Sequence, residues 1–362
     1  MTRKAWIAMS GGVDSSVAAW LMQQEGYDCT GVSMRLYRST DLGQACHKSC
    51  CAQEDLDDAA DAAFTLGIGF EVLDCQSLFR ERVMLPFARG YRRGETPNPC
   101  IDCNRYLKFD FLLSEALSRG CDCLATGHYA RIVKGENGRW LLQKALDESK
   151  DQSYVLAMLG QEQLSHLRFP LGELKKTRVR QLAGELGLGN AKKRDSQDIC
   201  FVPEGDYGAF LERQSGMPLR PGPFLDRDGQ VLGEHRGAER YTLGQRRGLG
   251  VAAGERLYVI GKDMVRNTVT LGPEEALYHQ SLIAGSVNCI AVERITEPLR
   301  VTARTRYHQA EQPATALPLA DGRLRVDFDE PQRAMTPGQT VVLYDGDTVV
   351  AGGIIREIRR EE

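Results

Sequence analysis

Short apolar runs alternate with amphipathic segments through the first half of the chain. Runs bounded by glycine or polar residues predict buried strands, and longer segments with apolar positions three or four residues apart predict helices. The strands are predicted at 5–9, 29–34, 69–74 and 123–126, and the helices at 14–25, 54–66, 78–91 and 108–118. This alternation predicts an α/β fold, a doubly wound parallel sheet with helices on both faces. Ligands bind beyond the carboxyl ends of such strands, so the loops after Met9, Met34 and Thr126 should meet in one crevice.

The pattern changes after about residue 205. Prolines at 218, 221 and 223 interrupt the chain, and short strands follow, predicted at 258–260, 268–271, 299–307, 324–328, 340–344 and 348–358. Asp228-Gly229 and Asp345-Gly346 are typical of hairpin turns. Evenly spaced short strands favour an antiparallel barrel or sandwich. We therefore predict three parts: an α/β domain at 1–205, a small central linking domain at 206–278 and a C-terminal antiparallel β-barrel at 279–362.

The composition is that of a globular protein. Of 362 residues, 42% are apolar and 26% are charged. No apolar stretch approaches the roughly 18 residues of a membrane span, and the apolar run after Arg3 and Lys4 is far too short for a signal peptide. We therefore expect a monomeric, cytoplasmic protein without a membrane partner. The formal net charge of −3 argues against a nucleic-acid binder, although local basic patches can override a net value.

A glycine-rich loop joins the first predicted strand to the first predicted helix, and its residues are Ala8, Met9, Ser10, Gly11, Gly12, Val13, Asp14 and Ser15. Without Cβ atoms, the two glycines let backbone N–H groups approach a phosphate at the positive end of the helix dipole. Asp14 is suited to help hold Mg²⁺. No lysine follows the glycines, so the loop is not of the Walker type. An ordinary capped turn is the alternative, but the loop resembles that of the PP-loop ATP pyrophosphatases, which cleave ATP between the α and β phosphates and activate a carbonyl oxygen as its adenylate.

Two of the eleven cysteines lie in segments that suit chemistry better than packing. Cys103 lies in the segment 96–104, which two prolines make rigid at its start and which leads toward a predicted helix. A thiol near a helix N-terminus has a lowered pKa and reacts as the thiolate. Cys200 lies in a polar segment at 196–201. Two reactive thiols together with an adenylating loop indicate sulfur transfer, in which one thiol carries a persulfide and the activated carbon receives its sulfur.

Several short motifs follow one another along the chain. They are the loop at 8–15, the segment 96–104, Thr-Gly-His-Tyr at 126–129, Lys-Asp-Gln-Ser-Tyr at 150–154, Ser-Gln-Asp-Ile-Cys-Phe at 196–201, the glycine- and arginine-rich run at 242–250, Arg-Tyr at 306–307 and Pro-Gly-Gln at 337–339. In content and order they are similar to the motifs of the tRNA-specific 2-thiouridylase family. The resemblance implies ATP-dependent thiolation at C2 of the wobble uridine of a tRNA anticodon. It also implies a PP-loop domain, a central domain and a β-barrel that resembles the second domain of elongation factor Tu and contacts tRNA.

The resemblance assigns roles position by position. Cys103 matches the family's nucleophile and Cys200 its persulfide-bearing cysteine, and the pair is able to form a disulfide. Residues 8–15 match ATP contacts, as do Met34 and Gly127. The residues that match the site for the target base are Asn98, Pro99 and Cys100. The residues that match tRNA contacts are His128, Lys150, Asp151, Gln152, Arg306, Tyr307 and Gln339.

Cys100 departs from the family pattern, because many members have Asp at this position. If that Asp is an acid or base in those members, its role here is open, and nothing in the sequence shows that Asp102 can replace it. Cys100, Cys103 and Cys200 also have the spacing to bind three irons of a [4Fe–4S] cluster and leave the fourth iron for sulfide. The persulfide and the cluster mechanism are both compatible with the sequence, and we favour the persulfide.

Two further groups of residues have weaker signals. Cys46, Cys50 and Cys51, with His47, are ligand types that zinc accepts, but they lack paired C-x-x-C spacing, and we interpret them as a thiol-rich flexible loop. The basic runs at 192–194 and 246–247 are interpreted as phosphate contacts.

Two other functions fit parts of the pattern. A different PP-loop adenylating enzyme that acts on a small molecule would leave Cys103 and Cys200 unexplained. A nucleotide-binding redox or metal sensor would explain the cysteines but not the tRNA-like motifs. The sequence therefore predicts a tRNA 2-thiouridylase with ATP and Mg²⁺ as cofactors. Its expected partners are tRNA and a sulfur-relay protein or cysteine desulfurase that donates the persulfide.

Overall fold

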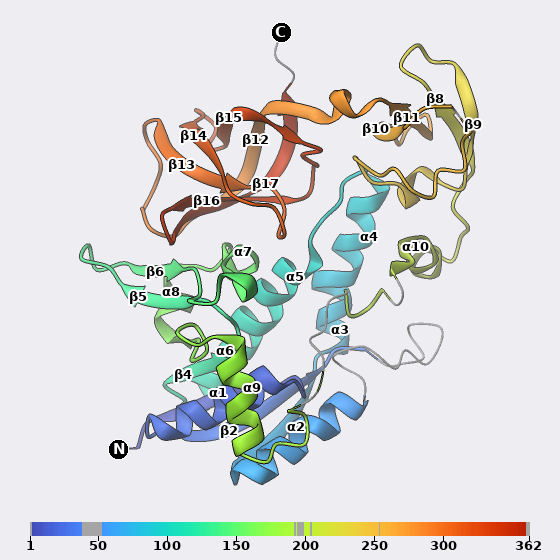
Figure 1. The fold of residues 1–362 in the computed structure, drawn as a ribbon. Helices are drawn as coiled ribbons and strands as arrows, with labels where there is room; N and C mark the ends of the chain where they lie inside the picture. The colour runs from blue at the N-terminus through green and yellow to red at the C-terminus, as the bar shows by residue number, and fades with distance from the viewer. Residues whose placement is uncertain are drawn as a thin grey trace.

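A five-stranded parallel sheet forms the lower part of the molecule in Figure 1, with the order β3-β2-β1-β4-β7. The computed structural model describes residues 2–37, 53–191, 193, 199–202, 205–252 and 254–359. The strands of this sheet are β1 (Lys4–Ala8), β2 (Asp28–Arg35), β3 (Gly69–Asp74), β4 (Cys123–Thr126) and β7 (Leu167–Arg168). All neighbouring strands are parallel, so the predicted doubly wound sheet is confirmed. The order reverses between β1 and β4, where ligand crevices form in such sheets.

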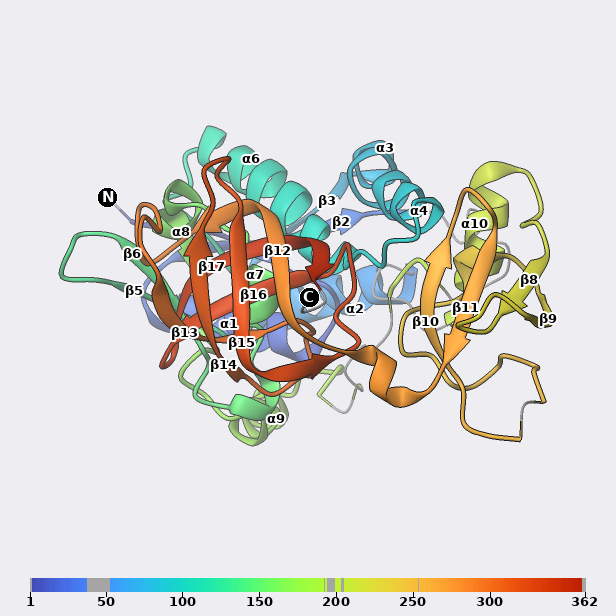
Figure 2. The same ribbon diagram turned by 90° about the horizontal axis from the view of Figure 1, so that it is seen from above.

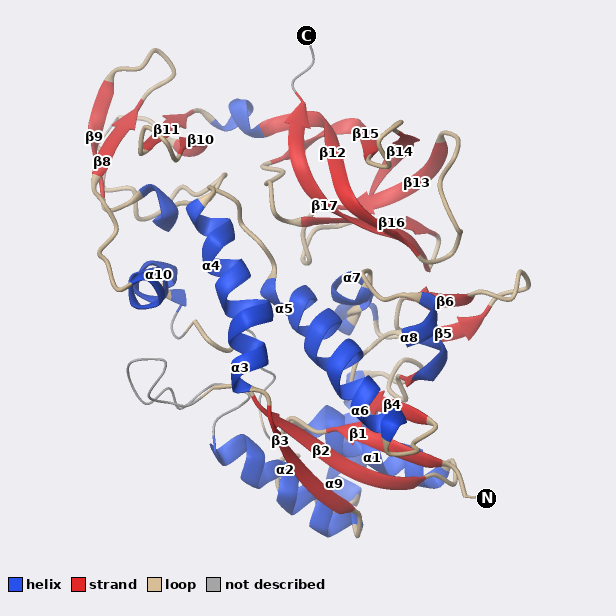
Figure 3. Cartoon of the chain, turned by 180° about the vertical axis from the view of Figure 1, so that it is seen from behind, coloured by secondary structure: helices blue, strands red, loops and turns tan. Residues whose placement is uncertain are grey.

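Helices cover both faces of the parallel sheet (Figure 3). Successive side chains of a strand point to opposite faces. Ile7 of β1 packs with one set of helices, and these are α1 (Val13–Gln24), α2 (Gln53–Leu66) and α9 (Lys176–Glu185). The adjacent Trp6 packs on the other face with a long helical segment, which consists of α5 (Pro99–Asp102), η3 (Cys103–Leu112) and α6 (Leu113–Ser118). Neither face of β1 is left to solvent.

The helical segment at 99–118 begins well before residue 108, where the sequence placed its start, so that prediction was wrong at this end. The side chain of Asn98 accepts a hydrogen bond from the Cys100 N–H at 3.1 Å and caps the helix. Pro99 then occupies the first helical position, where its fixed φ and missing N–H favour a helix start. Cys100 and Cys103 therefore lie inside the helix, within its first two turns. A second long segment consists of α3 (Gln76–Phe79), η2 (Arg80–Met84) and α4 (Leu85–Arg92).

Shorter elements complete the first domain, and two of them form a hairpin. The hairpin consists of β5 (Arg131–Lys134) and β6 (Trp140–Gln143). The others are η4 (Glu148–Lys150), α7 (Ser153–Leu156) and α8 (Gln161–His166). None of the helices that the structure describes is long and apolar enough to cross a membrane.

The central part carries a four-stranded sheet with the order β10-β11-β8-β9, which lies to one side of the barrel in Figure 2. Its elements are α10 (Tyr207–Ser215), β8 (Gly222–Leu225), β9 (Val231–His235), η6 (Ala238–Arg240), β10 (Tyr258–Asp263), β11 (Thr268–Gly272) and η7 (Glu274–Leu277). The turn predicted at Asp228-Gly229 joins β8 to β9.

The C-terminal part is a closed antiparallel barrel of six strands, as predicted. Its strands are β12 (Tyr278–Cys289), β13 (Leu299–Arg304), β14 (Gln312–Pro318), β15 (Leu324–Arg333), β16 (Thr340–Asp345) and β17 (Thr348–Arg359). β12 pairs with both β15 and β17, and this second pairing closes the barrel. β12 and β14 were not predicted, because polar residues and proline interrupt their apolar pattern.

The barrel is joined to the first domain by strand pairing and by a shared core. β6 pairs with β17 through Gln143 and Thr348, so the barrel sheet continues into the β5–β6 hairpin. Leu142 of β6 is buried in the same cluster as Tyr344 of β16. The ends of the three predicted parts stay a prediction, but the hairpin shows that the first and the last part share one sheet.

Candidate active site

The glycine-rich loop lies between β1 and α1, at the carboxyl edge of the parallel sheet. The carbonyl of Gly12 accepts hydrogen bonds from the hydroxyls of Ser15 and Ser16 at 3.0 and 3.2 Å. Gly11 has a φ of +72°, and a Cβ at this position would collide with the backbone of Asp55 in α2. Only glycine therefore fits at position 11. The loop wraps the N-terminus of α1, the position at which a helix binds anions.

The loop after β4 packs directly on the glycine-rich loop. A Cβ on Gly127 would lie 2.7 Å from the carbonyl carbon of Asp14 and from the nitrogen of Ser15. The loop after β1 is also tied to β2, because the Ser33 hydroxyl donates to the Met9 carbonyl at 2.5 Å. The loops after β1 and β4 therefore meet as predicted, whereas only residues 36 and 37 of the loop after β2 are described and its place in the crevice stays a prediction. Met34, the next residue of β2, is partly buried against the apolar clusters on that side of the sheet.

His128, which follows Gly127, is a buried side chain with 8% of its surface exposed. Its Nδ1 lies 2.6 Å from the Thr126 hydroxyl, and its ring packs against Phe109 and Phe169. Burial, with a smaller effect of Lys108, holds the pKa of His128 well below its usual range, so the ring is neutral. The buried ring therefore supports the loop after β4. The tRNA contact of His128 stays a prediction.

Asp14 is held by two side chains that the sequence analysis did not identify. The Lys176 ammonium donates to both carboxylate oxygens of Asp14, at 2.8 and 2.6 Å. The Tyr129 hydroxyl donates to Oδ1 of the same carboxylate at 2.8 Å. Lys176 is the first residue of α9 and has 7% of its surface exposed. In the sequence, Lys176 stands out only as a lysine at the start of an amphipathic helix. Its partner Asp14 is more than 160 residues away in sequence, so the contact could not be predicted.

Asn190 provides a further polar group at the glycine-rich loop. Its amide nitrogen donates to the Gly11 carbonyl and to the Ser16 hydroxyl, each at 3.0 Å. Its Oδ1 atom is buried and has no hydrogen-bond partner among the residues that the structure describes. An unpartnered buried acceptor costs free energy and fits a ligand that supplies a donor, such as a nucleotide hydroxyl or amine. The helix N-terminus, the glycine at 11 and this acceptor together fit ATP.

Cys100 and Cys103 lie one helical turn apart at the start of the 99–118 segment. Cys100 is exposed and Cys103 is half-buried. Between them, Ile101 is buried and anchors the turn. Burial raises the pKa of the Asp102 carboxyl to about 6, and the charge of Arg105 opposes this increase. The segment that matches the target-base site therefore presents two thiols and one carboxyl of raised pKa.

Cys200 is held in place by a hydrogen bond to its carbonyl and by the packing of the next residue. The Tyr37 hydroxyl donates to the Cys200 carbonyl at 2.9 Å. The next residue, Phe201, is 1% exposed and contacts Phe79 and Phe87 edge to face at 5.4 Å. Cys103 and Cys200 border the same apolar cluster, so the fold brings the two predicted catalytic thiols to one region. Residues 196–198 of the Cys200 motif lie outside the described part of the chain.

The side chains of Asp151 and Gln152 accept hydrogen bonds from backbone N–H groups. The Asp151 carboxylate is buried and accepts hydrogen bonds from the N–H groups of Ala145 and Ser153 at 3.2 and 3.1 Å. The Gln152 side chain accepts from the Tyr129 N–H at 3.0 Å. Gln152 therefore fixes the loop that carries Tyr129, and Asp151 fixes the chain at Ala145 and Ser153. Lys150 is half-buried in η4. The tRNA contacts assigned to all three stay predictions.

The barrel residues that match tRNA contacts lie where the barrel meets the first domain. The Tyr307 hydroxyl donates to the Asp151 carbonyl at 3.1 Å. Burial raises the pKa of Tyr307, and the charges of Asp151 and Cys100 add smaller effects in the same direction. The Arg306 guanidinium donates to the Ala334 carbonyl at 2.7 Å.

Gln339 connects the barrel to the segment that carries the thiols. Its side chain donates to the Thr96 carbonyl at 2.5 Å, and the Thr96 N–H donates to the Pro337 carbonyl at 2.9 Å. A Cβ on Gly338 would lie 2.8 Å from the Cβ of Glu95. The barrel therefore packs closely on the chain just before Asn98.

No group of three or more His, Cys, Asp or Glu side chains that could hold a metal ion occurs among the described residues. In this conformation Cys100, Cys103 and Cys200 thus do not meet as ligands of a cluster. The Cys46, Cys50 and Cys51 group, with His47, lies outside the described residues, as do Lys192 and Arg194. Lys193 is described and donates to Asp55 and Asp58 of α2. Arg246 and Arg247 are exposed, as phosphate contact requires.

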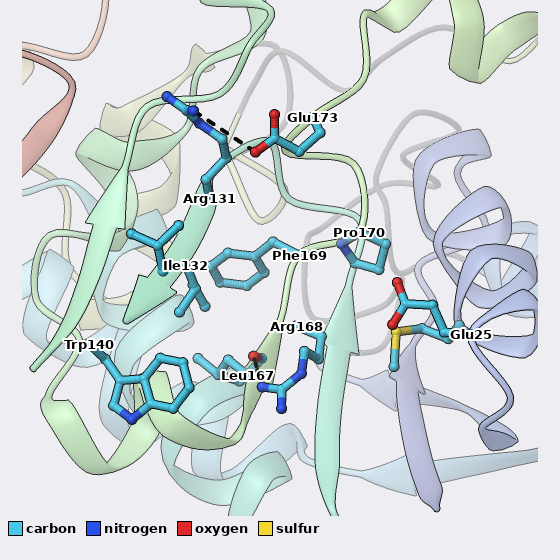
Figure 4. A pocket seen from close by; sticks show the side chains of 11 residues that line it. Glu25, Arg131, Ile132, Trp140, Leu167, Arg168, Phe169, Pro170 and Glu173 are labelled. Atoms are coloured by element: carbon cyan, nitrogen blue, oxygen red, sulfur yellow. Dashed lines mark hydrogen bonds and ion pairs between the residues drawn. The ribbon is translucent and has the colours of Figure 1, made fainter. Parts of the chain in front are cut away.

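A cavity of about 430 Å³ lies away from these residues (Figure 4). It is lined by Met22 and Glu25 near the C-terminal end of α1 and by parts of the β5–β6 hairpin and the chain around β7. Arg131 and Glu173 face each other at its upper edge at 3.9 Å. None of the predicted site residues lines it. The loops after β1 and β4, at the opposite end of α1, are therefore the candidate active site.

The fold and the crevice define a nucleotide-binding α/β protein of the PP-loop class, and comparisons with known families agree. The model of the tRNA methyl transferase HUP domain matches residues 3–204. The tRNA methyl transferase PRC-barrel domain matches 209–273, and the aminomethyltransferase beta-barrel domain matches 279–355.

Curated relatives make the assignment more specific. The tRNA-specific 2-thiouridylase MnmA of Clostridium acetobutylicum is 46% identical over 356 residues, which cover 98% of this chain and 100% of that protein. The protein of the same name from Acetivibrio thermocellus is 47% identical over 98% of this chain and 99% of its own length. The chain belongs to the tRNA-specific 2-thiouridylase family. It is a tRNA-modifying transferase with a PP-loop ATP-binding domain.

Solved structures match only distantly. A 4-thiouridine synthetase–RNA complex with bound ATP is 17% identical, with a TM-score of 0.37 over 56% of this chain and 46% of that chain. The NMN synthetase from Francisella tularensis is 17% identical, with a TM-score of 0.34 over 60% of this chain and 79% of that chain. These values are too low to carry an argument about this site.

Proposed function

We propose that this enzyme thiolates C2 of the wobble uridine of tRNA, with Cys103 as the nucleophile and Cys200 as the carrier of a persulfide. One observation carries the proposal. The two thiols come from segments far apart in sequence, yet both border one apolar cluster, which Met34 of β2 also borders. A small-molecule synthetase does not require that arrangement, and a redox or metal sensor would leave the tRNA-like motifs unexplained.

The enzyme uses ATP to adenylate the C2 oxygen of the uridine, so that this oxygen can leave as part of AMP. Residues 8–15, Met34 and Gly127 hold the nucleotide, and Asp14 helps to hold Mg²⁺. Asn98, Pro99 and Cys100 hold the target base, at the rigid start of the 99–118 helix. Tyr307 and Gln339 bring the barrel to this segment, and Lys150 and Arg306 add positive charge for the tRNA phosphates.

Sulfur transfer then needs both thiols. The terminal sulfur of the Cys200 persulfide attacks C2, and AMP leaves with the C2 oxygen. The Cys103 thiolate attacks the Sγ of Cys200 and breaks the sulfur–sulfur bond. The products are 2-thiouridine and a Cys103–Cys200 disulfide, which an external dithiol reduces. A sulfur-relay protein or cysteine desulfurase reloads Cys200. We further propose that the enzyme acts as a monomer in the cytoplasm.

The cluster mechanism is the second candidate, because Cys100 adds a third thiol. The described residues offer no set of three ligands in position for a metal, so the Cys100, Cys103 and Cys200 thiols do not fit a [4Fe–4S] cluster as they stand. The proposed mechanism therefore involves no iron, and substitution of Cys100 distinguishes the two mechanisms.

Single-turnover thiolation of tRNA, with a persulfide donor in air and without iron, tests the proposal. Cys200→Ser should form no 2-thiouridine, because no persulfide is available to attack C2, and Cys103→Ser should accumulate a tRNA adduct that dithiothreitol releases. Cys100→Ser should retain substantial activity, and Cys289→Ser, which replaces a half-buried thiol of the barrel, is the matched control. Mass spectrometry of protein and tRNA checks each outcome. Full turnover by Cys103→Ser would contradict the proposal, and joint loss of iron and activity in Cys100→Ser would favour the cluster.

A further inference from the structure

Asp14 carries two functions that conflict. Its carboxylate is the acidic group of the glycine-rich loop that is suited to Mg²⁺, and both of its oxygens already accept hydrogen bonds from the Lys176 ammonium. An ionised carboxylate has about four lone-pair sites, so Mg²⁺ can approach Asp14 while Lys176 is present. The two positive charges would repel each other there, and this repulsion favours movement of Lys176 away from Asp14 when Mg²⁺ binds.

We propose that Lys176 is a positioning residue that exchanges partners. It neutralises Asp14 in the absence of nucleotide and turns its charge to the pyrophosphate of ATP when Mg²⁺ takes its place on Asp14. The inference rests on the proposed function only in that the crevice binds MgATP.

The anchoring of Lys176 allows this exchange. Its backbone is fixed, because its N–H donates to the Asp147 carboxylate at 2.9 Å at the start of α9. The four-carbon side chain is then the only part that has to move, and its ammonium lies beside Asp14 in the first turn of α1. By rotating its side chain, Lys176 can bring its ammonium to a phosphate bound at the N-terminus of α1. Tyr129 keeps its own hydrogen bond to Asp14 and holds the carboxylate in place meanwhile.

Charge balance explains why metal and nucleotide should bind together. The Lys176 side chain is 9% exposed, so an ammonium that lost Asp14 to Mg²⁺ alone would be left almost without solvent. ATP without Mg²⁺ would place phosphate charge near an Asp14 carboxylate that still needs the ammonium. Only the joint arrival of Mg²⁺ and phosphate leaves each charge with an opposite partner.

Equilibrium binding to the full-length protein tests the exchange. The probes are Mn²⁺ without nucleotide, followed by electron paramagnetic resonance, and the α,β-methylene analogue of ATP with Mg²⁺, followed by calorimetry. Lys176→Met should bind Mn²⁺ about tenfold more tightly and the Mg²⁺–analogue complex about tenfold more weakly, the factor expected for one charge-assisted hydrogen bond. Lys175→Met, an exposed neighbour with the same charge change, should match the wild type with both probes.

The opposite signs distinguish exchange from a fixed structural ion pair. A Lys176→Met protein that binds both probes more weakly, or both as the wild type does, overturns the inference. If that variant does not fold, Asp14→Asn serves instead, and its binding of the analogue should no longer depend on Mg²⁺; retained Mg²⁺ dependence would overturn the inference as well. A wild type that fails to bind the Mg²⁺–analogue complex would instead refute the proposed function.

Discussion

Asp102 shows how the environment of a single residue differs from what its sequence neighbours suggest. It stands between Cys100 and Cys103 in an exposed-looking segment, yet burial raises its pKa to about 6. The segment and its thiols were predictable from the sequence, because the reactivity of cysteine and the rigidity of proline depend on residues close by in the chain. The sequence could not identify Lys176, Tyr129 or Asn190, because each acts on the glycine-rich loop from far along the chain.

The raised pKa of Asp102 predicts a pH-dependent cost to stability. An unfolded Asp has a pKa of about 3.9, so the native state binds the proton more tightly, and stability falls as pH rises from about 4 to about 6. Asp102→Asn removes this cost. The variant should exceed the wild type in free energy of unfolding by up to about 3 kcal/mol at pH 7.5, and the gain should vanish near pH 4. Urea unfolding at the two pH values measures the difference, and an equal gain at both would contradict the assignment.

At the scale of elements, the alternating first half of the chain was predictable because each strand and helix buries one face in a regular period. The strands 69–74 and 123–126 were predicted with the ends that the structure shows. The helix at 99–118 was placed too late, because its start depends on the cap at Asn98 rather than on apolar spacing. The β5–β6 hairpin was missed although its turn contains Asn137-Gly138, a strong hairpin signal, with Gly138 at a φ of +78°.

The contact between the loops after β1 and β4 predicts the effect of Gly127→Ala. The new methyl group would lie 2.7 Å from the backbone of Asp14 and Ser15, so the two loops must separate. We expect a loss of about 1–3 kcal/mol in stability and at least about tenfold weaker ATP binding, with tRNA binding retained. Gly184→Ala in α9 is the control, since its Cβ would meet nothing within 4 Å. Unchanged ATP affinity in Gly127→Ala would remove Gly127 from the nucleotide site.

At the scale of the whole molecule, the barrel is fixed to the first domain by a network of charged side chains. Lys144 pairs with Glu311 at 2.7 Å, and Arg304 pairs with Glu311 at 2.8 Å and with Asp151 at 3.5 Å. The three parts of the chain were predictable from the change in pattern near residue 205, but not their contacts, which join residues more than 150 positions apart.

This arrangement predicts how tRNA binding depends on salt. The net charge is −3, but phosphate contacts made by local arginines release counterions, so affinity should fall steeply with salt. Arg246→Ala should weaken binding and reduce the slope of log affinity against log salt by about one, if this exposed arginine contacts one phosphate. Filter binding at several salt concentrations measures the slope. Arg266→Ala, an exposed arginine of the same domain next to Asp263, is the control, and equal slopes in both variants would contradict the contact.

The pairing of β6 with β17 has a consequence for synthesis on the ribosome. Gln143 is translated about two hundred residues before its partner Thr348, which corresponds to roughly 10–40 s at ordinary elongation rates. During this interval the open edge of the hairpin and the apolar side chain of Leu142 have no cover from the barrel. We therefore expect a chain that ends before β17 to leave this strand edge unpaired and to aggregate more readily than the full-length chain.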